Sequence, residues 1–126
     1  MATLHAATAS RGAHVTDAQA VRQLCDAHCF GMLEWEVTET GEFSVWGYDA
    51  FDVYEADDEG LPDYEVGIRT RSFLRQLSQY IAPDAKLDIQ TAGYTKCRFP
   101  VHAQRYVVRE NEVLHADLGS LDPIDE

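Results

Sequence analysis

Two of the three cysteines flank a histidine in the segment VRQLCDAHCFGM, and cysteine and histidine are frequent zinc ligands in proteins. Cys25 and Cys29 are four residues apart, with His28 directly before Cys29. In a helix, this spacing places the two sulfur atoms on neighbouring positions of one face. Cys97 and His102 supply a second pair of suitable ligands, so the sequence offers Cys25, Cys29, Cys97 and His102 as a zinc-binding set.

The same segment also fits a helix that buries apolar and polarisable side chains against a sheet. Val21, Leu24, Cys25 and His28 recur at the spacing of a single helix face. The sequence lacks the short Cys-x2-Cys turn of most structural zinc sites, and free cysteine is among the most buried residue types. We therefore expect Cys25 to be a core residue and the protein to hold no cofactor, with zinc as the alternative.

A second place where the residue types suggest chemistry is the segment GIRTRSFLR, in which Arg69, Arg71 and Arg75 surround an expected helix start. Arginine at a helix N-terminus can bind an anion, although its charge is unfavourable with respect to the helix dipole there. The acidic loop, defined here as residues 55–63 (EADDEGLPD), precedes these arginines and can neutralise them. Because no glycine-rich phosphate loop accompanies the three anion candidates, we expect this internal pairing rather than a bound phosphate.

The segment FSVWGYDAFDVY, residues 43–54, is apolar on both faces of the strand that it predicts. Alternation places Phe43, Val45, Phe51 and Val53 on one face, and Trp46, Tyr48 and Tyr54 on the other. A two-layer domain has only one core side, so part of this aromatic surface should be exposed. The interface candidates, chosen because aromatic residues are enriched at protein interfaces, are Trp46, Tyr48, Phe51 and Tyr54.

The turn before this strand decides which of its faces is buried. A two-residue turn at Thr40 would pair Trp35 with Trp46, whereas a three-residue loop would pair Val37 with Val45 and reverse the face. The sequence leaves both registers open.

Two helices and six or seven strands should position these residues. The first helix is expected to begin at Thr16, whose Thr-x-x-Gln pattern is a capping box, and to end at Gly31. The second begins near Thr70 or Ser72 and has an apolar face made of Phe73, Leu74, Leu77, Tyr80 and Ile81. A final hairpin should turn after Arg109 and place that residue opposite Glu112.

The element order predicts an α+β fold, with two helices packed on one face of a mostly antiparallel sheet. The order helix, three strands, helix, three or four strands also suggests a doubled α-β-β-β arrangement. We expect residues 1–15 to be a loose N-terminal tail, 16–118 a single domain and 119–126 a polar C-terminal tail.

The charge excludes some functions and favours others. The 126 residues carry 22 acidic and 10 basic side chains, which gives a net charge of −12. Such a chain repels nucleic acid, because phosphate binding requires clustered cations. The acid excess with only two lysines, Lys86 and Lys96, resembles the composition of proteins from salt-accumulating microbes. It is also compatible with an acidic mimic of nucleic acid that captures a basic protein.

We find no paired-carboxylate, Ser-His-Asp, Walker or dinucleotide motif with supporting context. The first residues, MATLHAATASRGAHV, lack the apolar core of a secretory signal, and no apolar run approaches the roughly 20 residues of a membrane span. We therefore expect a non-catalytic cytoplasmic interaction module that does not bind membranes or nucleic acid. Its partner should be a protein or a second copy of the chain, most simply in a homodimer.

Overall fold

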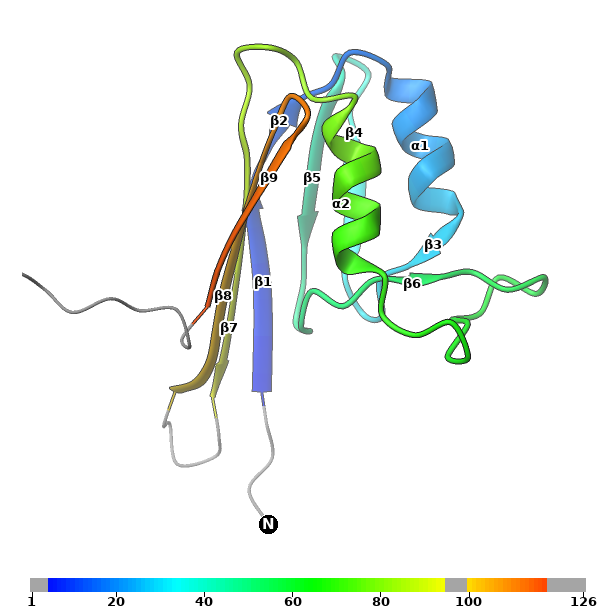
Figure 1. The fold of residues 1–126 in the computed structure, drawn as a ribbon, viewed down its shortest axis with the longest axis vertical. Coiled ribbons are helices and arrows are strands. Elements are labelled where there is room, and N and C mark those ends of the chain that lie inside the picture. Colours follow the sequence, from blue (N-terminus) through cyan, green and yellow to red (C-terminus); the bar gives the residue numbers. More distant parts are fainter. Residues whose placement is uncertain (1–4, 95–99, 118–126) are drawn as a thin grey trace, which may run out of the picture.

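The computed structural model describes residues 5–94 and 100–117 and has the expected α+β fold (Figure 1). Two helices, α1 (Ala18–Asp26) and α2 (Thr70–Ser78), contact each other on one side of the antiparallel sheets. Strands follow each helix: β3 to β6 come after α1, and β7 to β9 come after α2. Neither helix is long and apolar enough to cross a bilayer.

The larger sheet has four antiparallel strands in the order β1-β7-β8-β9. These strands are β1 (His5–Arg11), β7 (Leu87–Tyr94), β8 (Pro100–Arg109) and β9 (Glu112–Asp117). The last two form the predicted hairpin. It turns through Asn111 with φ of 57° and places Arg109 opposite Glu112, with their charged groups 3.8 Å apart.

The smaller sheet has the order β2-β5-β4, with β2 at Ala13–His14, β5 at Glu42–Trp46 and β4 at Glu34–Val37. It joins the larger sheet where Thr8 of β1 and Gly47 exchange two backbone hydrogen bonds of 2.8 and 2.9 Å. A two-stranded pair, β3 (His28–Cys29) and β6 (Tyr54–Glu55), lies near the C-terminal end of α1 (Figure 1).

The expectation of a loose N-terminal tail is wrong for residues 5–15. β1 pairs with β7 along its whole length, from His5 opposite Tyr94 to Arg11 opposite Asp88. β1 has no large apolar side chain. Its buried residue Thr8 packs against β7, and the Thr8 hydroxyl oxygen lies 2.8 Å from that of Thr91. Small polar side chains weaken the periodicity on which strand prediction depends. The predicted tail at 119–126 lies outside the described residues.

The expected limits of the first helix are also wrong. Asp17 is the N-cap, and its carboxylate accepts a hydrogen bond of 3.0 Å from the backbone N–H of Ala20. The hydroxyl of Thr16 instead donates to the carbonyl of Tyr80. The helix ends at Asp26, before His28, because the next residues pair with β6.

Neither of the two expected registers of the β4–β5 hairpin occurs. Trp35 pairs with Val45, and Val37 pairs with Phe43, across a four-residue loop at 38–41. The expected long strand also ends at Trp46, since the chain bends at Gly47 and becomes a strand again only at β6. This register buries Phe43 and Val45 and directs Trp46 outward.

The core lies between the helices and the inner faces of the strands. α2 contributes Phe73, Leu74 and Leu77, as its periodicity predicts, and Ile81 follows them. The sheets contribute alternate residues of β5 and β7, and the segment after β5 contributes Phe51 and Val53. The largest fully buried side chains are Phe43, Phe51, Phe73, Leu74, Leu77, Ile81, Leu87, Ile89, Val21, Val45, Val53 and Val108.

Candidate functional site

The cysteine and histidine side chains of the first segment are used in packing. Cys25 lies on the buried face of α1, only 1% exposed. His28 Nδ1 donates a hydrogen bond of 2.7 Å to the carbonyl of Leu24, and its ring meets Phe73 edge-on at 5.1 Å. The half-buried Cys29 donates from its thiol to the carbonyl of Gly60 at 3.3 Å.

The environment of the two thiols keeps them protonated. Burial raises the pKa of Cys25 to about 12, and the nearby carboxylate of Asp26 adds to the shift. The pKa of Cys29 is raised by burial and by Asp57. The thiolate is the form that attacks an electrophile or binds a metal. Neither thiol is therefore prepared for such chemistry at neutral pH.

The described residues do not assemble the zinc set. Cys97 lies outside them, and nothing is described of the His102 side chain. Where side chains are described, no group of three or more His, Cys, Asp or Glu residues could hold a metal ion. Cys25 itself belongs to the hydrophobic core.

The structure separates the four interface candidates. Phe51 is a core residue at 1% exposure, and Tyr54 is half-buried, with its ring 5.2 Å from that of Tyr64. Trp46 and Tyr48 are 39% and 87% exposed. Only these two are available to a partner, and Met32, which sequence reasoning did not select, is exposed beside them at 77%.

We call Met32, Trp46 and Tyr48 the aromatic patch. Its segments adjoin, because the backbone N–H of Met32 donates to the carboxylate of Asp49 at 2.9 Å. Gly47 lies so close to the 32–33 segment that a Cβ there would come within 3.1 Å of the Leu33 Cα. The segments that carry the three exposed side chains therefore adjoin where β5 ends.

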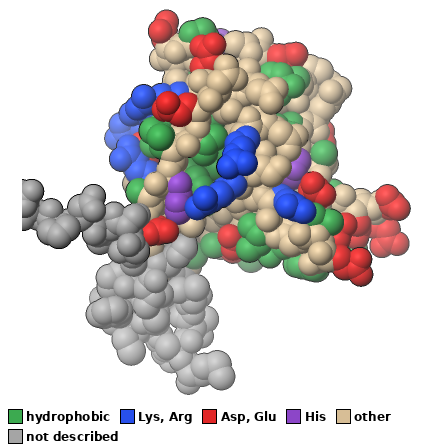
Figure 2. All heavy atoms as spheres, in the orientation of Figure 1, with side chains coloured by type: hydrophobic (Ala, Val, Ile, Leu, Met, Phe, Trp, Pro, Cys, Tyr) green, Lys and Arg blue, Asp and Glu red, His purple; other side chains and the backbone are tan. Residues whose placement is uncertain are grey.

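The acidic loop does not neutralise the arginines. Asp57 accepts hydrogen bonds of 2.9 Å from the backbone N–H groups of Glu59 and Leu61, so it folds its own turn. Asp63 likewise accepts hydrogen bonds of 3.2 and 3.3 Å from the backbone N–H groups of Glu65 and Val66. In Figure 2, acidic side chains gather on a projection at the lower right, with a Lys or Arg side chain near its base. No ion pair between the acidic loop and the three arginines is found among the described residues. The expected internal pairing is wrong.

The three anion candidates are all exposed, but they do not share one site. Arg69 is at the N-cap of α2 and makes no capping hydrogen bond. Arg71 and Arg75 line a hollow of about 80 Å³ with Tyr106, Val113 and His115. The ion pairs found across the described part of the chain are Arg105–Asp88 and Arg109–Glu112. No carboxylate there lies within salt-bridge distance of the three arginines.

His115 is the residue of this hollow that sequence reasoning missed. Its Nδ1 lies 3.4 Å from Nη2 of Arg71, and its ring lies 4.6 Å from that of Tyr106. Arg71 and His115 are 44 residues apart in the sequence, so no local pattern could connect them. The only available signal was alternation along β9, which places Val113 and His115 on one face.

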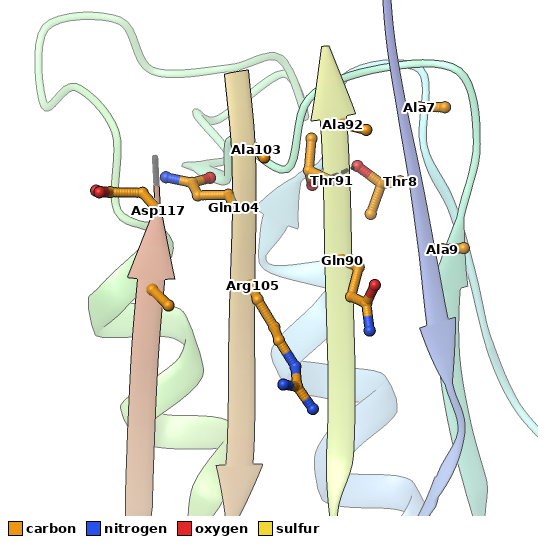
Figure 3. A pocket seen from close by; sticks show the side chains of 11 residues that line it. Ala7, Thr8, Ala9, Gln90, Thr91, Ala92, Ala103, Gln104, Arg105 and Asp117 are labelled. Atoms are coloured by element: carbon orange, nitrogen blue, oxygen red, sulfur yellow. Dashed lines mark hydrogen bonds between the residues drawn. The ribbon is translucent and has the colours of Figure 1, made fainter. Parts of the chain in front are cut away.

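The outer face of the larger sheet forms a broad hollow of about 500 Å³ (Figure 3). It is shallow because its lining is rich in alanine, from Ala7 and Ala9 on β1 to Ala116 on β9. Its charged lining residues are Arg105 and Asp117. Arg105 is paired with Asp88, and the nearest atoms of that pair are 2.6 Å apart. This surface presents little reactive chemistry.

No protein-family model, curated protein or solved structure matches this chain, so the arguments about its function rest on its own residues.

Proposed function

We propose that this protein is a non-catalytic protein-interaction module of a salt-rich cytoplasm and that the aromatic patch is its binding surface. The observation that carries the proposal is the exposure of Met32, Trp46 and Tyr48 on adjoining, hydrogen-bonded segments. Clustered exposed apolar side chains mark interaction surfaces. Trp, Tyr and Met are the residue types enriched in such surfaces.

The partner that we propose is a second copy of the chain, arranged around a two-fold axis. An apolar patch complements itself, and two-fold contacts are the commonest solution among soluble oligomers. The neighbouring side chains of Glu34 and Glu36 are exposed and acidic, so two copies repel each other at low salt. Salt screens this repulsion over a Debye length of about 10 Å at 0.1 M. Association should therefore strengthen as the salt concentration rises.

The test is the oligomeric state, measured by light scattering at low and at molar KCl. We expect a dimer in molar KCl that Trp46→Ser dissociates without unfolding the monomer. Leu114→Ser is the matched control, because Leu114 is an exposed apolar residue on the larger sheet and should leave the dimer intact. A monomer at every salt concentration would overturn the proposal. A dimer that Leu114→Ser dissociates and Trp46→Ser does not would show that the aromatic patch is not the dimer interface.

A second candidate function is an acidic mimic that captures a basic protein. Its support is the acidic loop and the residues after it, where Leu61 and Tyr64 are exposed among the acidic side chains of Asp58, Glu59 and Glu65. Capture through ion pairs weakens with salt, which is the opposite of the dependence expected for the dimer. Binding to an immobilised DNA-binding protein at low salt, lost in Asp58→Asn/Glu59→Gln, would favour this candidate over the first.

A further inference from the structure

We propose that Arg71 and Arg75 of α2, together with Tyr106 and His115 of the larger sheet, form a binding site for a phosphate group. The two arginines are one helical turn apart and face the same hollow, which β8 and β9 close from the other side. This site is distinct from the aromatic patch and does not depend on the proposed interaction function.

The first support is an unsatisfied histidine nitrogen. A guanidinium only donates hydrogen bonds, so the contact from Arg71 makes Nδ1 of His115 the acceptor. A neutral imidazole then carries its proton on Nε2. That nitrogen is buried and has no hydrogen-bond partner within the described residues. A buried donor without an acceptor is costly. Because this nitrogen is shielded from solvent, the His115 ring would have to turn toward the hollow to donate to a bound ion.

The second support is the charge of the hollow. Two cations one helical turn apart repel each other. No described carboxylate forms a salt bridge with Arg71 or Arg75, and the carboxylates of Asp52 and Asp117 act on Tyr106 of the same hollow through longer-range electrostatics. This arrangement stands out in a chain with 22 acidic residues and a net charge of −12. A ligand that carries negative charge would supply the direct ion pairs with the two arginines that these carboxylates do not make.

The donor types select the ligand. The planar guanidinium matches the oxygen geometry of phosphate and can bind it through two parallel hydrogen bonds. The hydroxyl of Tyr106, which is hydrogen-bonded to Arg71, and the N–H of His115 are further donors among the lining residues, and an anion with several oxygens can accept from more than one of them. A hollow of about 80 Å³ admits one small group, so the remainder of a larger ligand would extend into solvent. The class of ligand is inorganic phosphate or a phosphomonoester.

The test is calorimetric titration of the full chain, at low salt, with inorganic phosphate and separately with glycerol phosphate. We expect one equivalent to bind, and Arg71→Ala or Arg75→Ala each to weaken binding by about tenfold or more, as the loss of a charged hydrogen bond does. Tighter binding of the ester would identify an esterified ligand, and equal binding would show that the phosphate group alone is recognised. Either result supports the site.

Controls separate a site from general attraction. Arg69→Ala and Arg109→Ala each remove one exposed positive charge outside the hollow, so they should leave the affinity unchanged. His115→Phe keeps a ring against Tyr106 and removes the donor, and it should weaken binding while the protein remains folded by circular dichroism. Phosphate should also shift the His115 ring nitrogen signals in NMR spectra. No binding of either probe at millimolar concentration, or equal weakening by Arg109→Ala and Arg75→Ala, would overturn the proposal.

Discussion

Burial makes Cys25, a possible metal ligand or nucleophile in the sequence, unreactive in the folded protein. Its pKa of about 12 means that almost no thiolate forms near neutral pH. We expect iodoacetamide at pH 8 to leave Cys25 unmodified in the folded protein and to alkylate it after unfolding in denaturant. Mass spectrometry of the digested protein measures this, with Cys29 as the partly exposed internal comparison. Alkylation of Cys25 at the same rate in the folded and unfolded states would contradict its burial.

The ion pair of Asp88 and Arg105 makes a second prediction at this scale. Two hydrogen bonds, of 2.9 and 2.6 Å from Arg105, lower the pKa of Asp88, although burial acts in the opposite direction. A carboxyl with a lowered pKa in the folded state stabilises the protein above its unfolded-state pKa. This stability is lost as the pH falls through the folded-state pKa.

We therefore expect the free energy of unfolding to fall below about pH 4, and Asp88→Asn to flatten that fall. At neutral pH the variant should be less stable by about 1 kcal/mol or less, because Arg105 is half exposed and solvent screens its attraction to Asp88. Urea unfolding between pH 3 and pH 7 measures both effects. Asp58→Asn is the control, since Asp58 is exposed on the acidic loop. An identical pH dependence in Asp88→Asn and the wild type would contradict this role of the pair.

Among the elements, those with strong local signals could be predicted and the others could not. α2 follows from its apolar periodicity, and the β8–β9 hairpin follows from its turn residues. β1 was missed because its side chains are mostly small and because its place in the sheet comes from pairing with β7, which is distant in the sequence. The ends of α1 and the β4–β5 register depended on pairing with β6 and on a loop type, neither of which is encoded locally.

The candidate sites follow the same division. The exposed aromatic residues could be selected from a strand expected to be apolar on both faces. The register that exposes Trp46 could not be predicted, nor could the end of β5 at Trp46, after which the chain buries Phe51. The pairing of the arginines with the acidic loop was wrong, because short backbone contacts hold the carboxylate of Asp57 within its own turn. Aspartate side chains commonly accept hydrogen bonds from neighbouring backbone N–H groups in turns.

The β8–β9 turn provides a test at the scale of an element. Asn111 adopts a φ of 57°, which asparagine tolerates and glycine adopts freely. Its backbone N–H also donates to the carbonyl of Ser78 at the end of α2, at 3.0 Å. We expect Asn111→Ala to lower the free energy of unfolding by about 1 kcal/mol, and Asn111→Gly to remain close to the wild type. Chemical denaturation compares the two variants, and equal stabilities would mean that the turn relaxes away from this conformation.

At the scale of the whole molecule, the excess of acid should make stability depend on salt. Self-repulsion among exposed carboxylates destabilises a compact chain with a net charge of −12. In the part of the chain that the structure describes, the ion pairs are Arg105–Asp88 and Arg109–Glu112. Added salt therefore has few attractive charge pairs to weaken. Screening should therefore remove more repulsion than attraction.

We expect the midpoint of thermal unfolding, followed by circular dichroism, to rise between low salt and molar KCl. The measurement uses Trp46→Ser at low protein concentration, so that dimerisation does not contribute. Adding Asp58→Asn, Glu59→Gln and Glu65→Gln removes three exposed acidic charges whose side chains hold no turn, unlike Asp57. This variant should unfold at a higher temperature at low salt and respond less to KCl, because less repulsion is left to screen. A midpoint that falls with KCl in both proteins would mean that attraction between charges outweighs repulsion in this fold.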